Sequence, residues 1–203
     1  MSSSINYQKN LDYLKESIRI AEFQIDIVDQ ILEVSQVCIN SINNSGKILF
    51  CGNGGSASDS QHLAAEIVVR FKNTRKPLPA IALTTDTSII TSIGNDFGFE
   101  EIFSRQIEAI GNSEDVLIAF STSGKSANII KALTEARNKK ITTITFTGPN
   151  IDHIVDKSDF IISIPSEVTG VIQQSHITIG QLITMNIENN LLKKLDSIDM
   201  MSM

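Results

Sequence analysis

This sequence of 203 residues has only two cysteines, no long apolar run and no excess of basic charge. Its two cysteines, Cys38 and Cys51, form no CxxC pair, so we expect neither a disulfide framework nor a zinc site built from thiolates. No stretch approaches the roughly 18 apolar residues that a membrane-spanning helix needs, and the first residues lack the apolar core of a signal peptide. We therefore expect a cytoplasmic protein without a membrane segment.

The charged residues are balanced and scattered. Lys and Arg number 17 against 23 Asp and Glu, for a net charge of −6, with no charged tail. This excludes a broad electrostatic footprint for nucleic acid, and we expect no nucleic-acid partner. The hydrophobic content of 41% is enough for one buried core. Because no repeat or low-complexity linker divides the chain, the sequence predicts one domain over residues 1–203.

Two amphipathic helices are predicted at the N-terminus, within residues 1–44. Apolar residues recur at three- and four-residue spacing over residues 5–25 and 26–44, which is the pattern of a helix with one apolar face. Helices this apolar, placed before the first strand, either cover the sheet or pack against another subunit. The pattern leaves both alternatives open.

Short apolar runs, many of them β-branched, then alternate with helical segments such as 126–139. The predicted strands are 47–51, 79–83, 115–120, 141–147 and 159–164. Runs of this kind are typical of strands buried on both faces. The alternation predicts an α/β fold with a doubly wound, five-stranded parallel sheet. A long helix over about 168–195 closes this core of 45–195, and we expect 196–203 to be a frayed tail.

Two strand-to-helix turns are rich in glycine and hydroxyl groups. They are Gly52–Ser56 after the first strand and Ser121–Ser126 after the third. In a parallel α/β sheet, ligands bind beyond the carboxyl ends of the strands. Backbone N–H groups and helix dipoles converge on an anion there. One such turn could be a simple helix cap, but two on one sheet favour a phosphate site.

A nucleotide-binding P-loop is the competing interpretation of the second turn. Gly124-Lys125-Ser126 resembles the end of that motif, which also needs a glycine where Ala119 stands. The match is incomplete and falls on the third strand rather than the first. An ATP-dependent enzyme is therefore disfavoured.

His62 and Glu66 are the first candidates for chemistry. Four residues apart, they share one face of the helix that starts near Ser56. An imidazole and a carboxylate so placed can form an acid/base pair or supply two metal ligands. Polar residues also interrupt the apolar closing helix, at Gln173, Gln174, His176 and Gln181. Such groups either satisfy one another in a core or line a site.

Three segments, CGNGGSASDSQHLAAE, TSIGNDFGFEEIFSRQ and STSGKSANIIKAL, resemble the phosphoheptose isomerases, members of the sugar isomerase (SIS) fold family. The likeness runs in order from about Ser45 to the closing helix. It implies the SIS fold, a homotetramer and a phosphorylated sugar as substrate. The implied reaction is the aldose–ketose isomerisation of sedoheptulose 7-phosphate to D-glycero-D-manno-heptose 7-phosphate, which supplies lipopolysaccharide core or other heptose-containing glycans.

The resemblance also implies roles for individual residues. The residues that would hold phosphate and sugar hydroxyls are Asn53, Gly54, Gly55, Asn95, Asp96, Ser121, Thr122, Ser123 and Ser126. Asn95 and Asp96 are expected in a loop after the second strand and its short helix. Glu66 and Gln173 would face the reacting carbons, with Glu66 carrying a proton between them through an enediol. Some members bind zinc, for which His62, Glu66 and Gln173 match three ligand positions.

The chain departs from the family pattern at the second catalytic position. Gln181 stands where the family has a histidine, and Val171 where it has an arginine. Glutamine cannot exchange a proton at neutral pH and is a poor zinc ligand. Either His176 or water supplies the second acid, or the activity is weak or absent. The alternative function is a non-catalytic SIS module that binds a sugar phosphate or a protein partner such as a replication initiator. Because relatives of that kind typically lack the glutamate, Glu66 favours the isomerase.

Overall fold

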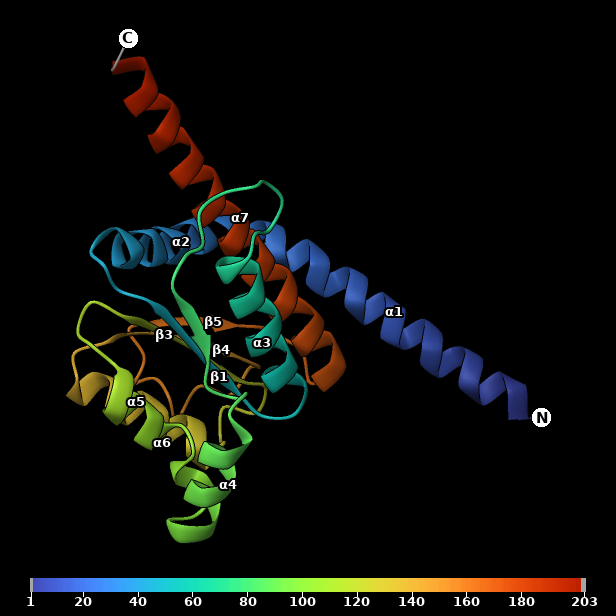
Figure 1. Ribbon diagram of the computed structural model, residues 1–203. Helices are drawn as coiled ribbons and strands as arrows, with labels where there is room; N and C mark the ends of the chain where they lie inside the picture. The colour runs from blue at the N-terminus through green and yellow to red at the C-terminus, as the bar shows by residue number, and fades with distance from the viewer. Residues whose placement is uncertain (1, 202–203) are drawn as a thin grey trace.

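The computed structural model describes the backbone of residues 2–201 and the side chains of residues 6–191. A five-stranded sheet lies between two layers of helices (Figure 1). Its strands are β1 (Ile48–Gly52), β2 (Ala80–Ala82), β3 (Val116–Ser121), β4 (Thr142–Thr147) and β5 (Phe160–Ser163). All neighbouring pairs are parallel, in the order β2-β1-β3-β4-β5. The order reverses between β1 and β3, so the predicted doubly wound parallel sheet is confirmed.

The helices also follow the predicted pattern. They are α1 (Ser2–Asp26), α2 (Val28–Asn43), α3 (Gly55–Val68), α4 (Thr87–Asp96), the short 3₁₀ helix η1 (Phe99–Glu101), α5 (Ser104–Ile110), α6 (Ala127–Asn138) and α7 (Thr169–Met201). The two predicted N-terminal helices are α1 and α2. The helix predicted near Ser56 is α3, and the one predicted over 126–139 is α6. No helix among the described residues is both long and apolar enough to cross a membrane.

The end of the closing helix differs from the prediction. Helix α7 continues to Met201, past Leu195, so the expected frayed tail is wrong for residues 196–201. The sequence after Leu195 contains no glycine or proline that would stop a helix. Residues 202 and 203 lie outside the described residues.

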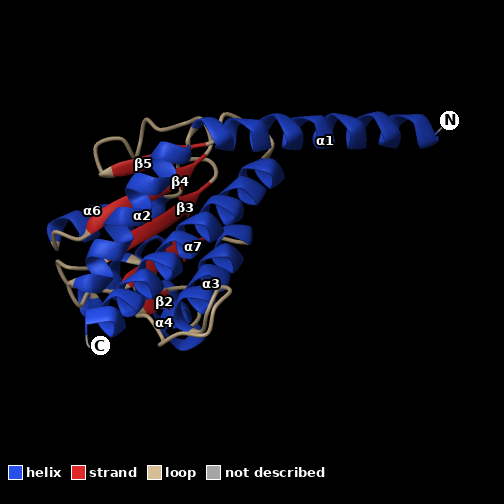
Figure 2. Cartoon of the chain, turned by 90° about the horizontal axis from the view of Figure 1, so that it is seen from above, coloured by secondary structure: helices blue, strands red, loops and turns tan. Residues whose placement is uncertain are grey.

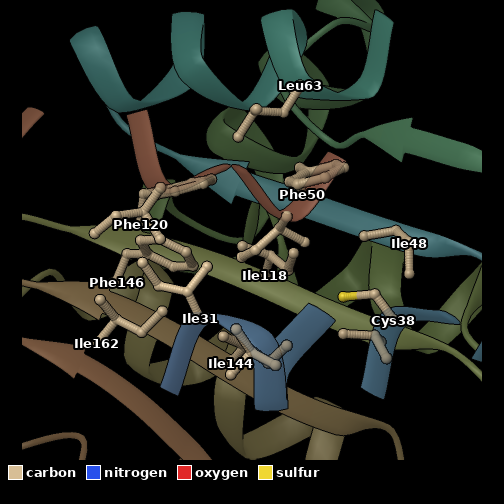
Figure 3. Packing of buried hydrophobic residues seen from close by; sticks show 14 of the residues in the cluster. Ile31, Cys38, Ile48, Phe50, Leu63, Ile118, Phe120, Ile144, Phe146 and Ile162 are labelled. Atoms are coloured by element: carbon tan, nitrogen blue, oxygen red, sulfur yellow. The ribbon is translucent and has the colours of Figure 1, made fainter. Parts of the chain in front are cut away.

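Each face of the sheet carries its own apolar core. On one face, Leu63 of α3 lies over Phe50 and Phe120, whose rings stack with centroids 6.5 Å apart, and Cys38 of α2 lies beside Ile48 (Figure 3). Helix α7 completes this layer. On the other face, Leu117 and its neighbours are covered by α4, α5 and α6. Because successive strand residues point to opposite faces, covering both faces requires the continuous apolar runs seen in the sequence.

Helix α1 extends away from the rest of the chain (Figures 1 and 2). Four large apolar side chains along it are more than half exposed: Tyr7, Leu14, Ile18 and Ile25. Their spacing of seven, four and seven residues aligns them in one stripe. Of the two alternatives that the sequence left open, α2 follows the first and covers the sheet, while α1 leaves its apolar stripe exposed.

Candidate active site

The two predicted phosphate loops follow β1 and β3, and each contains a glycine that its backbone conformation requires. Gly54 has φ +55° and Gly124 has φ +66°, a region that favours glycine. At Gly124 a Cβ atom would also lie 2.0 Å from the carbonyl oxygen of Asn150. Ala119, which a P-loop would replace by glycine, is fully buried inside β3. The second loop is therefore a tight strand-to-helix turn and lacks the longer glycine loop of a nucleotide-binding motif.

A cavity of about 320 Å³ opens beside the second loop. Its polar lining includes Thr122, Ser123 and Lys125 of the loop and Thr169, the first residue of α7. The N-terminus of α6 begins just after the loop, at Ala127. Hydroxyl groups, helix N-termini and one ammonium group suit a phosphate. Glu167 lines the same cavity, so the opening is not uniformly positive and also offers an acceptor to a sugar hydroxyl.

Asn53 ties the first loop to the second. Its side-chain amide donates to Oδ1 of Asn128 and accepts from Nδ2 of Asn128, both at 2.8 Å. Asn128 is only 3% exposed and lies in the first turn of α6. The pair leaves one amide hydrogen and one lone pair of Asn53 for a ligand. The sequence analysis did not single out Asn128, because 75 residues separate it from Asn53 and no local pattern links them.

Asn95 and Asp96 lie elsewhere than expected. They form the last turn of α4 rather than a loop, and Asn95 Nδ2 donates to Asp96 Oδ1 at 2.7 Å. Ten residues of helix carry Asp96 about 15 Å from the N-cap residue Asp86. Asp96 lines a different cavity, between α4 and α5, with Phe97 and Arg105. Within one chain, the structure therefore places this pair apart from the cavity of the second loop.

Glu66 is the centre of the chemical group on α3. His62 Nε2 lies 2.9 Å from its Oε1, and Gln181 Nε2 of α7 donates to the same oxygen at 3.3 Å. The other oxygen, Oε2, is buried and has no hydrogen-bond partner among the described residues. One oxygen of the carboxylate is therefore held from two sides, while the other has no hydrogen-bond partner among the described residues.

Asp59 is a neighbour that the sequence analysis missed. It lies three residues before His62 on α3, so Asp59, His62 and Glu66 follow one face of the helix. Its Oδ2 is buried without a partner. Burial raises the pKa of Asp59 to about 6, against an opposing effect of His62. The three- and four-residue spacing that linked His62 to Glu66 could have found this residue too.

His176 does not supply the second acid, so that alternative is wrong. It is fully buried, with its ring 5.8 Å from that of Phe120 and 5.6 Å from that of Phe146. Its Nε2 lies 3.3 Å from the carbonyl oxygen of Thr147. Burial lowers the pKa of His176 to about 4, so it is a neutral core residue at physiological pH. Of the three histidines in the sequence, His62 is the one bonded to Glu66.

The candidate residues fall into two groups along α3. Gln173 packs against Gly55 at the start of the helix, where a Cβ on the glycine would lie 2.6 Å from Gln173 Nε2. From Gly55 to Glu66 is eleven residues of helix, or about 16 Å. The phosphate loops with Gln173 form one group, and His62, Glu66 and Gln181 form the other. A single chain does not bring the two groups together.

The separation of these two groups also decides whether the residues of one chain can bind zinc. His62 and Glu66 lie together, but Gln173 lies at the other end of α3. The described residues contain no group of three or more His, Cys, Asp or Glu that could hold a metal. Zinc is normally held by at least three nitrogen, sulfur or carboxylate ligands. The residues of one chain therefore do not fit a zinc ion by themselves.

Comparison with known proteins gives the family. The SIS domain model matches residues 12–148. A phosphoheptose isomerase from Maridesulfovibrio salexigens is 44% identical over 193 residues, covering 95% of this chain and 94% of that protein. One from Burkholderia pseudomallei is 48% identical over 162 residues, covering 80% and 82%.

Solved structures agree with these relatives. The phosphoheptose isomerase of Neisseria gonorrhoeae aligns with a TM-score of 0.83 at 37% identity, covering 90% of this chain and 98% of that chain. The enzyme of Francisella tularensis aligns with a TM-score of 0.85 at 32% identity, covering 91% and 98%. The chain thus belongs to the phosphoheptose isomerase family of SIS-domain proteins.

Proposed function

We propose that this chain is a phosphosugar isomerase that converts sedoheptulose 7-phosphate into D-glycero-D-manno-heptose 7-phosphate, a precursor of lipopolysaccharide core or other heptose-containing glycans, in the cytoplasm. The observation that carries the proposal is the Glu66 carboxylate, held at Oε1 by His62 and unpartnered at Oε2. A carboxylate that is held in a fixed position can take a proton from one carbon and return it to the next. Relatives 44% identical that are named phosphoheptose isomerase support the same reaction.

In this mechanism Glu66 and His62 divide the proton transfers. The carboxylate of Glu66 removes a proton from C1 of the ketose, which gives an enediol, and returns it to C2. His62 carries the proton that leaves the C1 hydroxyl to the oxygen on C2. Imidazole exchanges protons near neutral pH, whereas the amide of Gln181 cannot. Gln181 instead holds the carboxylate in place, so His62 takes the acid/base part that the family pattern gives to a histidine at position 181.

The cavity beside the second loop binds the 7-phosphate. Ser123 and Lys125 face it, together with the first residue of α7. Such groups bind phosphate without forming a covalent bond to it. Gln173, packed at Gly55 close to the first loop, would contact the sugar beyond the phosphate.

The working site combines two subunits of a homotetramer. The phosphate loops and Glu66 are separated by about 16 Å of α3, which is longer than an extended seven-carbon sugar phosphate. One subunit would therefore supply the loops and another Glu66. The exposed apolar stripe on α1 supports association, because a helix with such a stripe is normally covered by a partner. Zinc, if present, would be held by His62 and Glu66 with a further donor from a neighbouring subunit, and no step above depends on it.

Assay of the wild type and of Glu66→Gln tests the proposal. We expect the wild type to turn over sedoheptulose 7-phosphate, and Glu66→Gln to lose turnover while still binding the sugar phosphate. Gln181 favours a second candidate, a non-catalytic SIS module, which predicts binding without conversion. Absence of turnover by the wild type, with and without added zinc, would support that candidate and contradict the isomerase.

A further inference from the structure

A buried ion pair lies at the end of helix α3. Arg75, in the segment after the helix, and Glu188 of α7 have side chains only 2% and 1% exposed, with Nε and Oε1 3.2 Å apart. An isolated buried charge is costly, and a buried pair persists only when further hydrogen bonds satisfy it. The reaction described above uses neither residue.

Arg75 binds the main chain of Glu66. Its Nη2 donates to the carbonyl oxygen of Glu66, and its Nη1 to that of Ile67, both at 2.9 Å. Because α3 ends at Val68, its last carbonyl groups need partners from outside the helix. A cation at a helix C-terminus also complements the helix dipole. The guanidinium group therefore fixes the last turn of α3, the turn that carries Glu66.

Glu188 holds the segment from which Arg75 reaches this turn. Its carboxylate accepts the backbone N–H groups of Phe71, Lys72 and Asn73 at 2.9 to 3.0 Å, and the Asn73 side chain at 3.1 Å. Burial alone would raise the pKa of Glu188, but these N–H groups hold it below its ordinary value. The carboxylate is therefore charged and fully bonded.

Helix α7 is linked to Glu66 in two ways, directly at its side chain and, through Arg75, at its main chain. Gln181 and Glu188 are seven residues apart, about two turns, on one face of α7. Gln181 bonds to the carboxylate of Glu66, and Glu188, through Arg75, bonds to its carbonyl group. The side chain and the main chain of Glu66 are therefore both held in place by contacts that lead to one helix.

We propose that Arg75 and Glu188 are positioning residues, which hold the last turn of α3 so that the Glu66 carboxylate stays in place for the proton transfer. The proposal rests on the function proposed above, because that function makes Glu66 the base. The competing explanation is an anchor for residues 69–76 that has no catalytic consequence. The two differ in kcat, because misplacing a catalytic group by about 1 Å can cost up to about a hundredfold in rate.

The test compares Arg75→Ala, Arg75→Lys and Glu188→Gln in the full-length protein. Arg75→Lys keeps the charge, but one ammonium group cannot replace the planar fork that bonds two carbonyl groups and Glu188. In each of the three variants we expect kcat to fall about ten- to a hundredfold, with KM little changed. Millimolar guanidinium chloride should restore part of the kcat of Arg75→Ala. Hydrogen exchange should quicken in residues 66–73. If Arg75→Ala folds poorly, Arg75→Lys and Glu188→Gln give the decisive values.

Asp115→Asn is the matched control. The buried Asp115 forms another ion pair, with the partly exposed Lys47 at 2.6 Å, which joins the starts of β1 and β3. This variant should lose stability but keep its kcat. A folded Arg75 variant with wild-type kcat would overturn the proposal. If the wild type itself shows no turnover, the proposed function fails, and the hydrogen-exchange rates alone test the positioning role. Variants that exchange as slowly as the wild type over residues 66–73 would then overturn the proposal.

Discussion

The side-chain amide of Gln181 donates to Oε1 of Glu66 across 3.3 Å, and so joins α7 to the carboxylate that His62 contacts at 2.9 Å. This amide can orient the carboxylate but cannot exchange a proton with the substrate. Position 181 therefore fixes Glu66 without adding an acid, and the consequences of the glutamine are open to direct test.

Gln181→His should give the chain a zinc site. The substitution places a second imidazole beside Glu66 and His62, which completes the three strong donors that zinc requires. We expect bound zinc to rise towards one ion per chain, as measured by metal analysis after gel filtration. Gln181→Ala removes the amide without adding a metal ligand, and its zinc content should stay at the wild-type level. Equal zinc contents in wild type and Gln181→His would contradict the geometry.

Mixing two inactive variants should restore activity. Glu66→Gln removes the base, and Ser123→Asp places a negative charge in the phosphate cavity, so each should be inactive alone. If loops and base come from different subunits, a mixed oligomer contains some intact sites, and turnover of sedoheptulose 7-phosphate should reappear. Mixing Glu66→Gln with His62→Ala is the control, since both changes affect the same half of the site. Failure of the first mixture to regain turnover would place the whole site within one subunit.

Asn128→Ala should weaken both the fold and the site. Its removal leaves the amide of Asn53 without its partner, which costs about 1 to 3 kcal/mol in the free energy of unfolding. Urea unfolding measures this loss, and calorimetric titration in a Glu66→Gln background should show weaker sugar phosphate binding. Gln36→Ala removes an exposed amide pair on α2 and should change stability by less than about 0.5 kcal/mol. Unaltered binding by Asn128→Ala would show that the tie between the loops is not needed.

Asp59→Asn should alter how stability depends on pH. Burial raises the pKa of Asp59 from 3.8 to about 6, so the folded chain favours the protonated carboxyl. The stabilisation from this group is complete below about pH 4 and is lost as pH rises towards 6. Asp59→Asn avoids that loss. Above pH 6 its free energy of unfolding should therefore exceed that of the wild type by about 1 kcal/mol, a value reduced for the partial exposure of this side chain. Urea unfolding at pH 4.5 and pH 8 measures this, with Asp156→Asn as an exposed control. If the free energy of unfolding of Asp59→Asn differed from that of the wild type by the same amount at both pH values, this prediction would be wrong.

Local patterns were sufficient to locate the five strands. The predicted run 79–83 contains β2 (Ala80–Ala82), and 141–147 contains β4 (Thr142–Thr147), because continuous apolar runs reflect burial on both faces of a sheet. The end of α7 was missed because nothing after Leu195 marks a stop. The position of Asp96 was missed because a turn-forming residue can also end a helix.

The sequence by itself determined the parallel α/β fold, the two glycine-rich turns after β1 and β3, and the pairing of His62 with Glu66, because helix spacing and strand burial are properties of adjacent residues. Only the tertiary structure decided which residues meet across the chain. It buried His176 against Phe120 and Phe146, and it brought Gln181 to Glu66, 115 residues away. Arg75 and Glu188, 113 residues apart, meet for the same reason. The packing of α3 along α7 sets these contacts, and no spacing within either helix specifies which residue of the other it will face.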